Sequence, residues 1–230
     1  MKAFVLAGGS GTRLRPRFAD LPKALVPVAG RPFAVRQLEW LRGHGITQVV
    51  LCVGHGAARI QDALGDGSAH GVTLEYSIER EPLGTGGALG HAVARVEGAT
   101  LVVNGDTLAP CDPWALERAR WEHGAIGALA LFEVSETKTR GRVEQNGSGR
   151  ITRFVEKDGA HRGPGWVNGG VYAFGASLWR QIPAGPVSLE RDVLPRLAAR
   201  GGLHGERCTG DFFDIGTPEE WERAERSLTT

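Results

Sequence analysis

The first residues that could do chemistry lie in the stretch Leu6–Pro16, LAGGSGTRLRP, directly after a short apolar run. Glycines leave backbone N–H groups uncovered for an anion, and the guanidinium of Arg13 matches the oxygens of a phosphate. Lys23, in DLPKALVPV, adds a compact positive charge. The stretch has neither the GxGxxG spacing of dinucleotide folds nor the GxxxxGK[ST] of P-loops. Taken alone, it leaves a phosphate site and an ordinary solvated basic turn equally open.

Two aspartates follow in positions suited to a cation. Asp106 lies in VVNGDTL, directly after a second apolar run, and Asp214 lies in DFFDIGTPEEW, before a helix start signal. Mg²⁺ prefers carboxylates, phosphate oxygens and water as ligands, so the pair suits a triphosphate site. The plainer alternative for either residue is a turn or cap.

The elements that must position these residues alternate between strands and helices. Apolar runs typical of buried parallel strands lie at 2–7, 48–53 and 100–103. Helical patterns separate them at 33–44, 57–64 and 86–96. This alternation predicts right-handed βαβ crossovers, which bring the glycine stretch and Asp106 to the same edge of a parallel sheet.

The second half of the chain has a different pattern. Turns such as Asn146-Gly147 separate strand-like segments at 126–134, 141–145, 150–155 and 167–174, which predicts antiparallel strands. Helices return at 189–199 and at 218–228, the latter with Thr217 as N-cap. We therefore expect an α/β fold with a mixed sheet, and a chain of 230 residues fits one domain.

Composition narrows the function classes. With 27 Lys+Arg against 26 Asp+Glu, the net charge of +1 favours neither nucleic acid nor a charged membrane surface as a partner. The apolar run at the amino terminus is too short for a signal peptide or a membrane span, which predicts a cytoplasmic protein. Cys52, Cys111 and Cys208 lack CxxC or metal-ligand spacing and are interpreted as free thiols.

LAGGSGTRLRP followed by DLPKALVPVAGRPF resembles the signature of the sugar-1-phosphate nucleotidylyltransferases, GxGTRLxP with a downstream PK and a small-G-[KR]-P turn. These enzymes join a nucleoside triphosphate to a sugar 1-phosphate and release pyrophosphate. The resemblance runs from Met1 to about Thr217. It implies a Rossmann-like three-layer α/β/α fold with a mixed, mostly parallel central sheet and a smaller antiparallel sugar-binding part. It also implies a single domain over 1–230, with a nucleotide half at about 1–110, a sugar half at about 111–230 and no C-terminal β-helix.

The resemblance also implies residue roles. Arg13, Lys23 and Asp106 would be catalytic, and Asp106 and Asp214 would hold Mg²⁺ as the cofactor. No protein nucleophile is required, because an oxygen of the sugar phosphate attacks the α-phosphorus directly. The nucleotide would contact Leu6, Ala7, Gly8, Gly9, Ser10, Gly11, Thr12, Arg13, Lys23, Glu79, Pro82, Gly84, Thr85, Asn104 and Gly105.

The loop SIEREPLGTGGA at 77–88 would embrace the nucleobase, with Glu79 facing its edge. A carboxylate there can accept from both the N1–H and the exocyclic amine of guanine, which favours GTP. Some uridylyl-transferring relatives also carry a glutamate here, so the base stays open. For the sugar phosphate, the resemblance implies contacts to Gly141, Glu156, Lys157, Asn168 and Gly169.

Among short members of the family, YSIEREPLGTGGAL and FFDIGTPEEW look most like the D-glycero-α-D-manno-heptose 1-phosphate guanylyltransferases, which make GDP-heptose for bacterial surface polysaccharides. The alternatives are a mannose 1-phosphate guanylyltransferase and an N-acetylmuramate 1-phosphate uridylyltransferase. A non-catalytic nucleotide-sugar sensor is a further alternative, but it would be expected to lose Arg13, Lys23 or a metal aspartate. The six tryptophans could serve the core or the interface of a homodimer.

Overall fold

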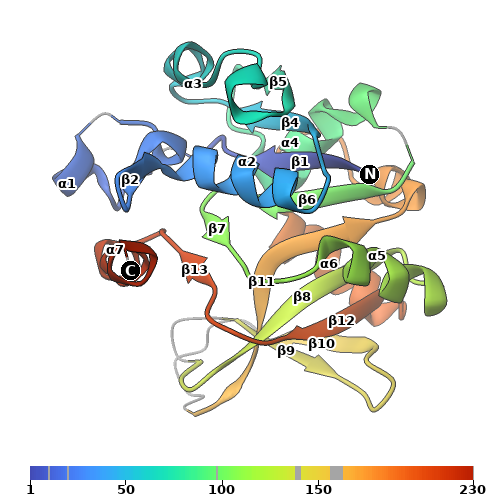
Figure 1. Ribbon diagram of the computed structural model, residues 1–230. Helices are drawn as coiled ribbons and strands as arrows, with labels where there is room; N and C mark the ends of the chain where they lie inside the picture. Colours follow the sequence, from blue (N-terminus) through green and yellow to red (C-terminus); the bar gives the residue numbers. More distant parts are fainter. Residues whose placement is uncertain (10, 20, 97, 138–140, 156–162, 230) are drawn as a thin grey trace.

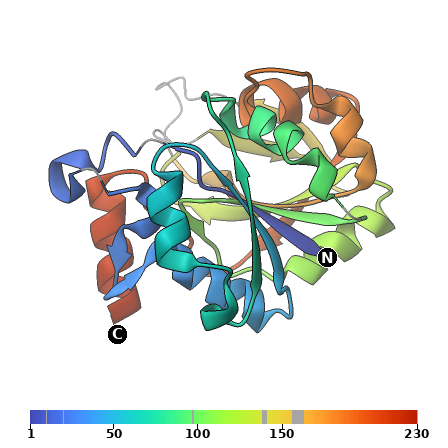
Figure 2. The ribbon, with the colours of Figure 1, turned by 90° about the horizontal axis from the view of Figure 1, so that it is seen from above.

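The computed structural model describes residues 1–9, 11–19, 21–96, 98–137, 141–155 and 163–229. A central sheet carries helices on both faces, as Figures 1 and 2 show from two directions. The helices are α1 (Arg15–Phe18), α2 (Phe33–Gly43), α3 (Ala57–Leu64), α4 (Gly84–His91), α5 (Pro113–Glu122), α6 (Leu194–Ala199) and α7 (Pro218–Thr229). The strands of the main sheet are β1 (Lys2–Leu6), β4 (Gln48–Val53), β5 (Thr73–Ile78), β6 (Thr100–Asn104), β8 (Gly127–Val134), β9 (Arg142–Gln145), β10 (Ile151–Val155), β11 (Gly165–Phe174) and β12 (Leu203–Cys208).

Two short ladders complete the structure. β2 (Pro27–Val28) pairs with β3 (Arg31–Pro32), and β7 (Thr107–Leu108) pairs with β13 (Phe213–Asp214). None of the helices in the described part of the chain combines the length and the apolar character needed to cross a membrane.

The main sheet is mixed and mostly parallel, as the sequence predicts. β5, β4, β1 and β6 are neighbours in that order and all run parallel. β11 lies antiparallel beside β6 and also pairs with β8, while β9 and β10 form an antiparallel extension at the beginning of β11. The carboxyl ends of β1, β4 and β6 therefore lie at one edge, which is where open α/β sheets bind ligands.

β12 was not predicted from the sequence. The four segments expected to be antiparallel do pair that way, as β8, β9, β10 and β11, whereas β12 pairs with β8 in parallel, from Leu203 opposite Gly127 to Cys208 opposite Phe132. The sequence of β12, LHGERC, mixes polar and apolar residues, so it lacks the apolar run that predicts a buried strand. The predicted helix at 189–199 is also split, into a π-helical turn over Leu189–Val193 and α6.

β5 and α5 were not predicted either. β5, TLEYSI, mixes buried and exposed residues and is the last strand of the sheet, beyond β4. Helix α5 has a start signal in the sequence, since Asp112 is its N-cap, accepting a hydrogen bond from the backbone N–H of Trp114 at 2.9 Å, and Pro113 follows at the first position.

The apolar core has two layers, one on each face of the sheet. Alternate residues of β1 point to opposite faces: Ala3 and Val5 pack with α2, α3 and α5, whereas Phe4 packs with α4 and α6. Each fully buried leucine or phenylalanine in these layers contributes about 1.5–3 kcal/mol of hydrophobic free energy. This packing confirms the three-layer α/β/α arrangement.

A third cluster joins residues from the two ends of the sequence. Trp221 and Ala224 of α7 pack with Phe213 and Ile215 against the earlier apolar residues Leu14, Val26, Val28 and Phe33. The indole Nε1 of Trp221 donates to the carbonyl of Pro27 at 2.8 Å, and Figure 1 shows α7 beside β2. The cluster fixes the position of the segment after β13 relative to the segment that carries Lys23.

Two of the three free cysteines meet in space. Cys111 follows β7 and Cys208 ends β12, yet their side chains are hydrogen-bonded. The neighbouring segments are also close, because a methyl group on Gly210 would lie 3.2 Å from the ring of Pro110. The thiol of Cys111 donates to the sulfur of Cys208, which lowers the pKa of Cys208 and, together with burial, raises that of Cys111. Burial raises the pKa of the Cys52 thiol to about 12.

These pKa directions predict an order of reactivity. Because the thiolate is the nucleophile, iodoacetamide at about pH 8 is expected to alkylate Cys208 well before Cys52 or Cys111, as measured by mass spectrometry over time. The variant Cys111→Ala removes the hydrogen bond and should slow the labelling of Cys208. Equal labelling rates at the three thiols would contradict this assignment.

Candidate active site

Two cavities open side by side at the carboxyl edge of the parallel strands. The larger has a volume of about 470 Å³ and the smaller about 270 Å³, and Leu6 and Gly9 line both. Leu6 and Gly9 thus form a shared wall along which a ligand could span the two cavities. Of the residues predicted to contact nucleotide, those that line one cavity or the other are Leu6, Ala7, Gly8, Gly9, Gly11, Thr12, Arg13, Lys23, Glu79, Pro82, Gly84, Thr85 and Gly105.

The smaller cavity brings positive and negative side chains together. Arg13, Lys23 and Asp106 line it, and the ammonium of Lys23 lies 2.5 Å from Oδ2 of Asp106. The Lys23 side chain is only 13% exposed and that of Asp106 30%, so water screens the pair less than it would screen a surface ion pair. The other carboxylate oxygen of Asp106, Oδ1, accepts a hydrogen bond from the hydroxyl of Thr107 at 3.4 Å.

The turn that presents Asp106 depends on a glycine. The N–H of Gly105 donates to the carbonyl of Leu6 at 3.0 Å, and a Cβ on Gly105 would lie 2.4 Å from that oxygen. The clash would be with backbone, which cannot move aside as a flexible side chain can. Gly105 therefore allows the ends of β1 and β6 to approach and fixes Asp106 beside the glycine stretch.

Asp214 reaches the same place from the other end of the sequence. It pairs with Thr107 in the β7–β13 ladder, and the N–H of Ile215 donates to the backbone carbonyl of Asp106 at 2.9 Å. Oδ1 of Asp214 accepts from the N–H of Gly216 at 2.8 Å. A methyl group on Gly216 would lie 2.8 Å from Oδ1 of Asp214, 3.2 Å from the guanidinium of Arg13 and 3.5 Å from Nζ of Lys23. Two cationic and two anionic side chains therefore converge around Gly216.

This donor set fits a hard divalent cation. Within the described ranges, no cluster of three or more His, Cys, Asp and Glu side chains has the arrangement of a metal site. Mg²⁺ does not need one, because it commonly binds one or two carboxylates and completes its shell with water and substrate phosphates. Asp106 and Asp214 provide those two carboxylates beside cations suited to phosphate.

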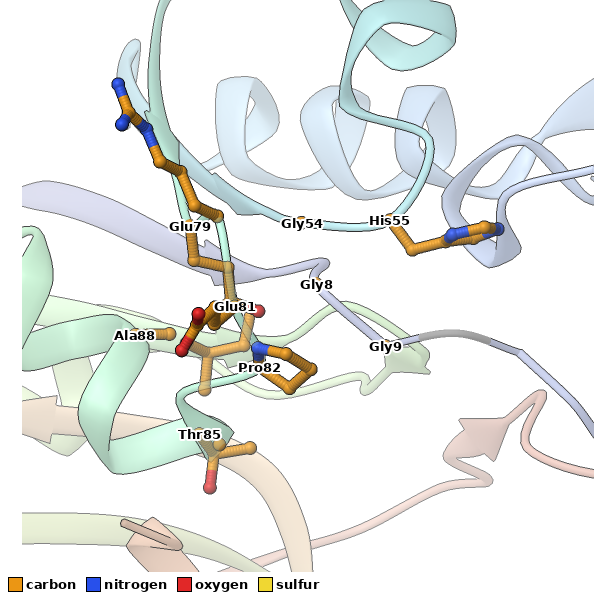
Figure 3. Close-up of a pocket in the computed structure, with 12 residues that line it drawn as sticks. Gly8, Gly9, Gly54, His55, Glu79, Glu81, Pro82, Thr85 and Ala88 are labelled. Atoms are coloured by element: carbon orange, nitrogen blue, oxygen red, sulfur yellow. The ribbon is translucent and has the colours of Figure 1, made fainter. Parts of the chain in front are cut away.

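Glu79 dominates the larger cavity. Figure 3 shows it beside Gly8 and Gly54, on the opposite side from His55. A methyl group on Gly8 would lie 2.6 Å from Oε1 of Glu79, and one on Gly54 would lie 2.8 Å from it. A side chain at position 8 would therefore displace the carboxylate of Glu79, in addition to covering the backbone N–H groups that the sequence predicts to be accessible.

The environment of Glu79 changes its acidity. Burial raises the pKa of its carboxyl above the ordinary value, although a hydrogen bond from the N–H of Leu83 at 3.3 Å and the nearby His91 act in the opposite direction. The carboxylate is thus held in a partly desolvated position, where it gains more from new hydrogen-bond donors than it would in water.

The loop after Glu79 is supported from outside the cavity. Gly84 has φ of +70°, and the carbonyl of Val187 accepts from the N–H groups of Gly86 at 2.8 Å and Gly87 at 3.1 Å. The hydroxyl of Thr85 donates to Oε2 of Glu190 at 2.6 Å. Thr85 lines the cavity as predicted, but its hydroxyl is bound to the protein.

The predicted sugar residues are only partly described. Glu156 and Lys157, like Ser10 of the glycine stretch, lie outside the described residues. Asn168 donates from Nδ2 to the hydroxyl of Tyr172 at 2.8 Å and accepts from the N–H of Gly170 at 3.0 Å, so its amide is already paired within the protein.

The remaining three predicted contacts have different surroundings. A methyl group on Gly169 would lie 2.5 Å from the ring of Phe132, and one on Gly141 would lie 3.4 Å from the carbonyl of Val155. Asn104 lines neither cavity, but its side chain is hydrogen-bonded to Tyr172. Burial raises the pKa of Tyr172 well above its ordinary value, so its hydroxyl stays neutral while it joins Asn104 of β6 to Asn168 of β11.

Sequence reasoning did not identify His55 and Gln37, among other residues at this edge. His55 lines the larger cavity and follows β4 by two residues, so the rule that ligands bind beyond strand carboxyl ends could have indicated it. Gln37 of α2 is buried beneath the Asp106 turn. A single glutamine in a helix gives no signal of such a position.

The sequence profile of the family described as "Nucleotidyl transferase" matches residues 2–230. The chain belongs to this family. It is 35% identical over 230 residues to a mannose-1-phosphate guanylyltransferase of Mycobacterium tuberculosis, covering 98% of this chain but 64% of that protein. The chain thus spans a little less than two thirds of that relative. It is 33% identical over 230 residues to the D-glycero-alpha-D-manno-heptose 1-phosphate guanylyltransferase of Aneurinibacillus thermoaerophilus, covering 99% and 98% of the two chains.

Solved structures agree with this placement. The crystal structure of HddC from Yersinia pseudotuberculosis has a TM-score of 0.86 and 30% identity, with 99% of both chains covered. The structure of HddC complexed with GMP-PN gives a TM-score of 0.85 at 29% identity, over 99% of both chains.

The raised pKa of Glu79 predicts a stability difference. A group whose pKa is raised by folding contributes stability below its ordinary pKa and loses it as the pH rises through its folded pKa. At about pH 8, Glu79→Gln should therefore melt at a higher temperature than the unmodified protein, and the gap should shrink as the pH falls toward 4.5. Thermal denaturation across this range measures it, with Glu81→Gln as the exposed control. An unchanged or lower melting temperature at pH 8 would show that Glu79 is not desolvated.

Proposed function

We propose that the protein transfers GMP from GTP to a sugar 1-phosphate, with D-glycero-α-D-manno-heptose 1-phosphate as the favoured acceptor, and releases pyrophosphate. The observation that carries this proposal is the convergence of Arg13, Lys23, Asp106 and Asp214 beside the cavity that holds Glu79. In this proposal, the triphosphate occupies the smaller cavity, which contains Arg13 and Lys23, and the nucleobase occupies the larger one, which contains Glu79. The proposed product, GDP-heptose, would be made in the cytoplasm as a donor for bacterial surface polysaccharide.

The proposed reaction is one in-line displacement. A non-bridging oxygen of the sugar 1-phosphate forms a bond to the α-phosphorus of GTP. The bond from that phosphorus to the oxygen bridging to the β-phosphate breaks, and pyrophosphate leaves with the electron pair. Arg13 and Lys23 hold phosphate oxygens and balance the charge that gathers on the leaving group.

The metal fits this scheme as a proposed cofactor. Asp106 and Asp214 would hold Mg²⁺, which when bound supplies further neutralisation of the phosphates. Lys23 contacts Asp106, and as a flexible point charge it can turn from this carboxylate to a phosphate oxygen without leaving the cavity.

Glu79 supports guanine as the base. Its desolvated carboxylate, reached from the cavity between Gly8 and Gly54, can accept from the N1–H and the exocyclic amine of guanine together. Uracil and thymine offer one ring N–H and no amine donor on that edge. The base of GTP would therefore donate to both carboxylate oxygens of Glu79, whereas the base of UTP or dTTP would leave one of them without a donor from the nucleotide.

Mannose 1-phosphate is the second candidate acceptor, because the Mycobacterium tuberculosis mannose-1-phosphate relative is as similar in sequence as the heptose 1-phosphate one. The stretches YSIEREPLGTGGAL and FFDIGTPEEW, which look most like the heptose 1-phosphate guanylyltransferases, favour heptose. N-acetylmuramate 1-phosphate with UTP is a third pair to assay.

A pyrophosphate-release assay decides the substrates. GTP, UTP, dTTP, ATP and CTP are each paired with heptose, mannose and N-acetylmuramate 1-phosphates, and the GTP and heptose 1-phosphate pair is expected to give the highest kcat/KM. A higher value for another pair would replace the proposed substrates and keep the reaction class. Nucleotide binding with no turnover of any pair would favour a sensor.

The proposed metal ligands give a sharper prediction. Asp106→Asn and Asp214→Asn should each lower kcat at least about 100-fold, because each removes a carboxylate while keeping its shape. Circular dichroism and melting temperature check that the variants remain folded. Asp211→Asn, an exposed aspartate in the same segment as Asp214, is the matched control and should keep its activity. Near-normal turnover of Asp106→Asn would exclude Asp106 as a metal ligand.

A further inference from the structure

A glutamine lies buried beneath the turn that carries Asp106. Gln37 of α2 is 1% exposed, and its amide Nε2 donates to the carbonyl of Asn104 at 2.9 Å and to that of Thr107 at 2.7 Å. These two carbonyls flank Gly105 and Asp106. The side chain of Gln37 therefore binds both ends of the turn through hydrogen bonds.

Each of the four residues of the turn, 104–107, has a backbone N–H or carbonyl that is hydrogen-bonded to another part of the chain. Besides the two carbonyls that Gln37 holds, the N–H of Gly105 donates to Leu6, and the carbonyl of Asp106 accepts from the N–H of Ile215. The anchors come from α2, β1 and the segment directly after β13. Gln37 is the anchor made by a side chain, so it can be removed without changing the backbone.

The amide of Gln37 is only half used. Its oxygen, Oε1, is buried with no hydrogen-bond partner in the described part of the chain. An unpaired buried acceptor costs free energy, and a leucine or methionine would avoid that cost among the apolar neighbours of α2. The two donated hydrogen bonds are what the glutamine adds.

We propose that Gln37 is a positioning residue for the divalent cation. It fixes the Asp106 turn, to which the segment that carries Asp214 is joined by the hydrogen bond from the N–H of Ile215 to the carbonyl of Asp106. This inference rests on the proposed function, since it requires Asp106 and Asp214 to hold the metal. Residues that orient metal ligands typically change metal affinity or activity by about 10- to 100-fold when they are replaced.

The test compares Gln37→Met with Leu41→Met. Methionine has nearly the shape of glutamine but no N–H donors, so Gln37→Met removes both hydrogen bonds with little change in volume. Leu41 is a fully buried residue of the same helix that makes none of these contacts, so Leu41→Met controls for repacking.

Two readouts separate positioning from stability. The first is Mn²⁺ binding by electron paramagnetic resonance, with the protein holding a GTP analogue that cannot be cleaved between the α- and β-phosphates. The second is the Mg²⁺ concentration that gives half-maximal rate. For Gln37→Met we expect Mn²⁺ affinity to fall about 10- to 100-fold, the half-maximal Mg²⁺ to rise in parallel, and excess Mg²⁺ to restore part of kcat. Leu41→Met should match the unmodified protein in both.

The other outcomes overturn the inference. If Gln37→Met lowers the melting temperature but binds Mn²⁺ with unchanged affinity, Gln37 is merely structural. If the unmodified protein binds Mn²⁺ and Asp106→Asn abolishes that binding while Gln37→Met does not weaken it, the proposed metal site stands and the positioning role fails. If Asp106→Asn and Asp214→Asn leave Mn²⁺ binding unchanged, the metal site itself is wrong and the inference fails with it.

Discussion

The close approach of two strand ends, at Leu6 and Gly105, is the constraint on which the rest of the site depends. After β1 the chain crosses through α2 on one face of the sheet, and before β6 it crosses through α4 on the other. The two connections leave a crevice between the strand ends, as at the switch points of other open α/β sheets. The Leu6 carbonyl and Gly105 N–H close the floor of that crevice. A side chain at 105 would separate the strands, and the glycine stretch would no longer face Asp106.

Electrostatics in this crevice are balanced locally. Arg13 and Lys23 lie near Asp106 and Asp214, so two positive and two negative formal charges balance within the site, and the whole chain has a net charge of only +1. Net charge therefore says nothing about this anion site. Binding of a phosphate would rearrange the ion pair of Lys23 and Asp106, which lies in a half-buried environment where charges interact more strongly than they do at a fully solvated surface.

Local signals explain what could be predicted from the sequence. The glycine stretch, Asp106 and His55 each follow an apolar strand, and Asp214 precedes a capped helix, so neighbouring residues indicate their places. Contacts between distant segments leave no such trace. The residues around Cys111 and Cys208 do not indicate that the two thiols meet. The residues around Gly8 likewise do not indicate that the carboxylate of Glu79 fills the space beside it. β5 and β12 were missed for a related reason, because their residues suit particular neighbours rather than a uniform apolar layer.

The cluster between α7 and the segment before α2 has a consequence for the order of folding. Leu14, Val26 and Phe33 pack with Phe213, Ile215 and Trp221, residues that a ribosome adds almost two hundred positions later. The strands β1, β4, β5 and β6 can pair during synthesis, since each meets its neighbour within the first half of the chain. Val26 and Val28, close to Lys23, cannot complete this cluster until α7 has emerged. During synthesis, these four parallel strands can therefore pair before the charged crevice is complete, because Asp214 and α7 are added later.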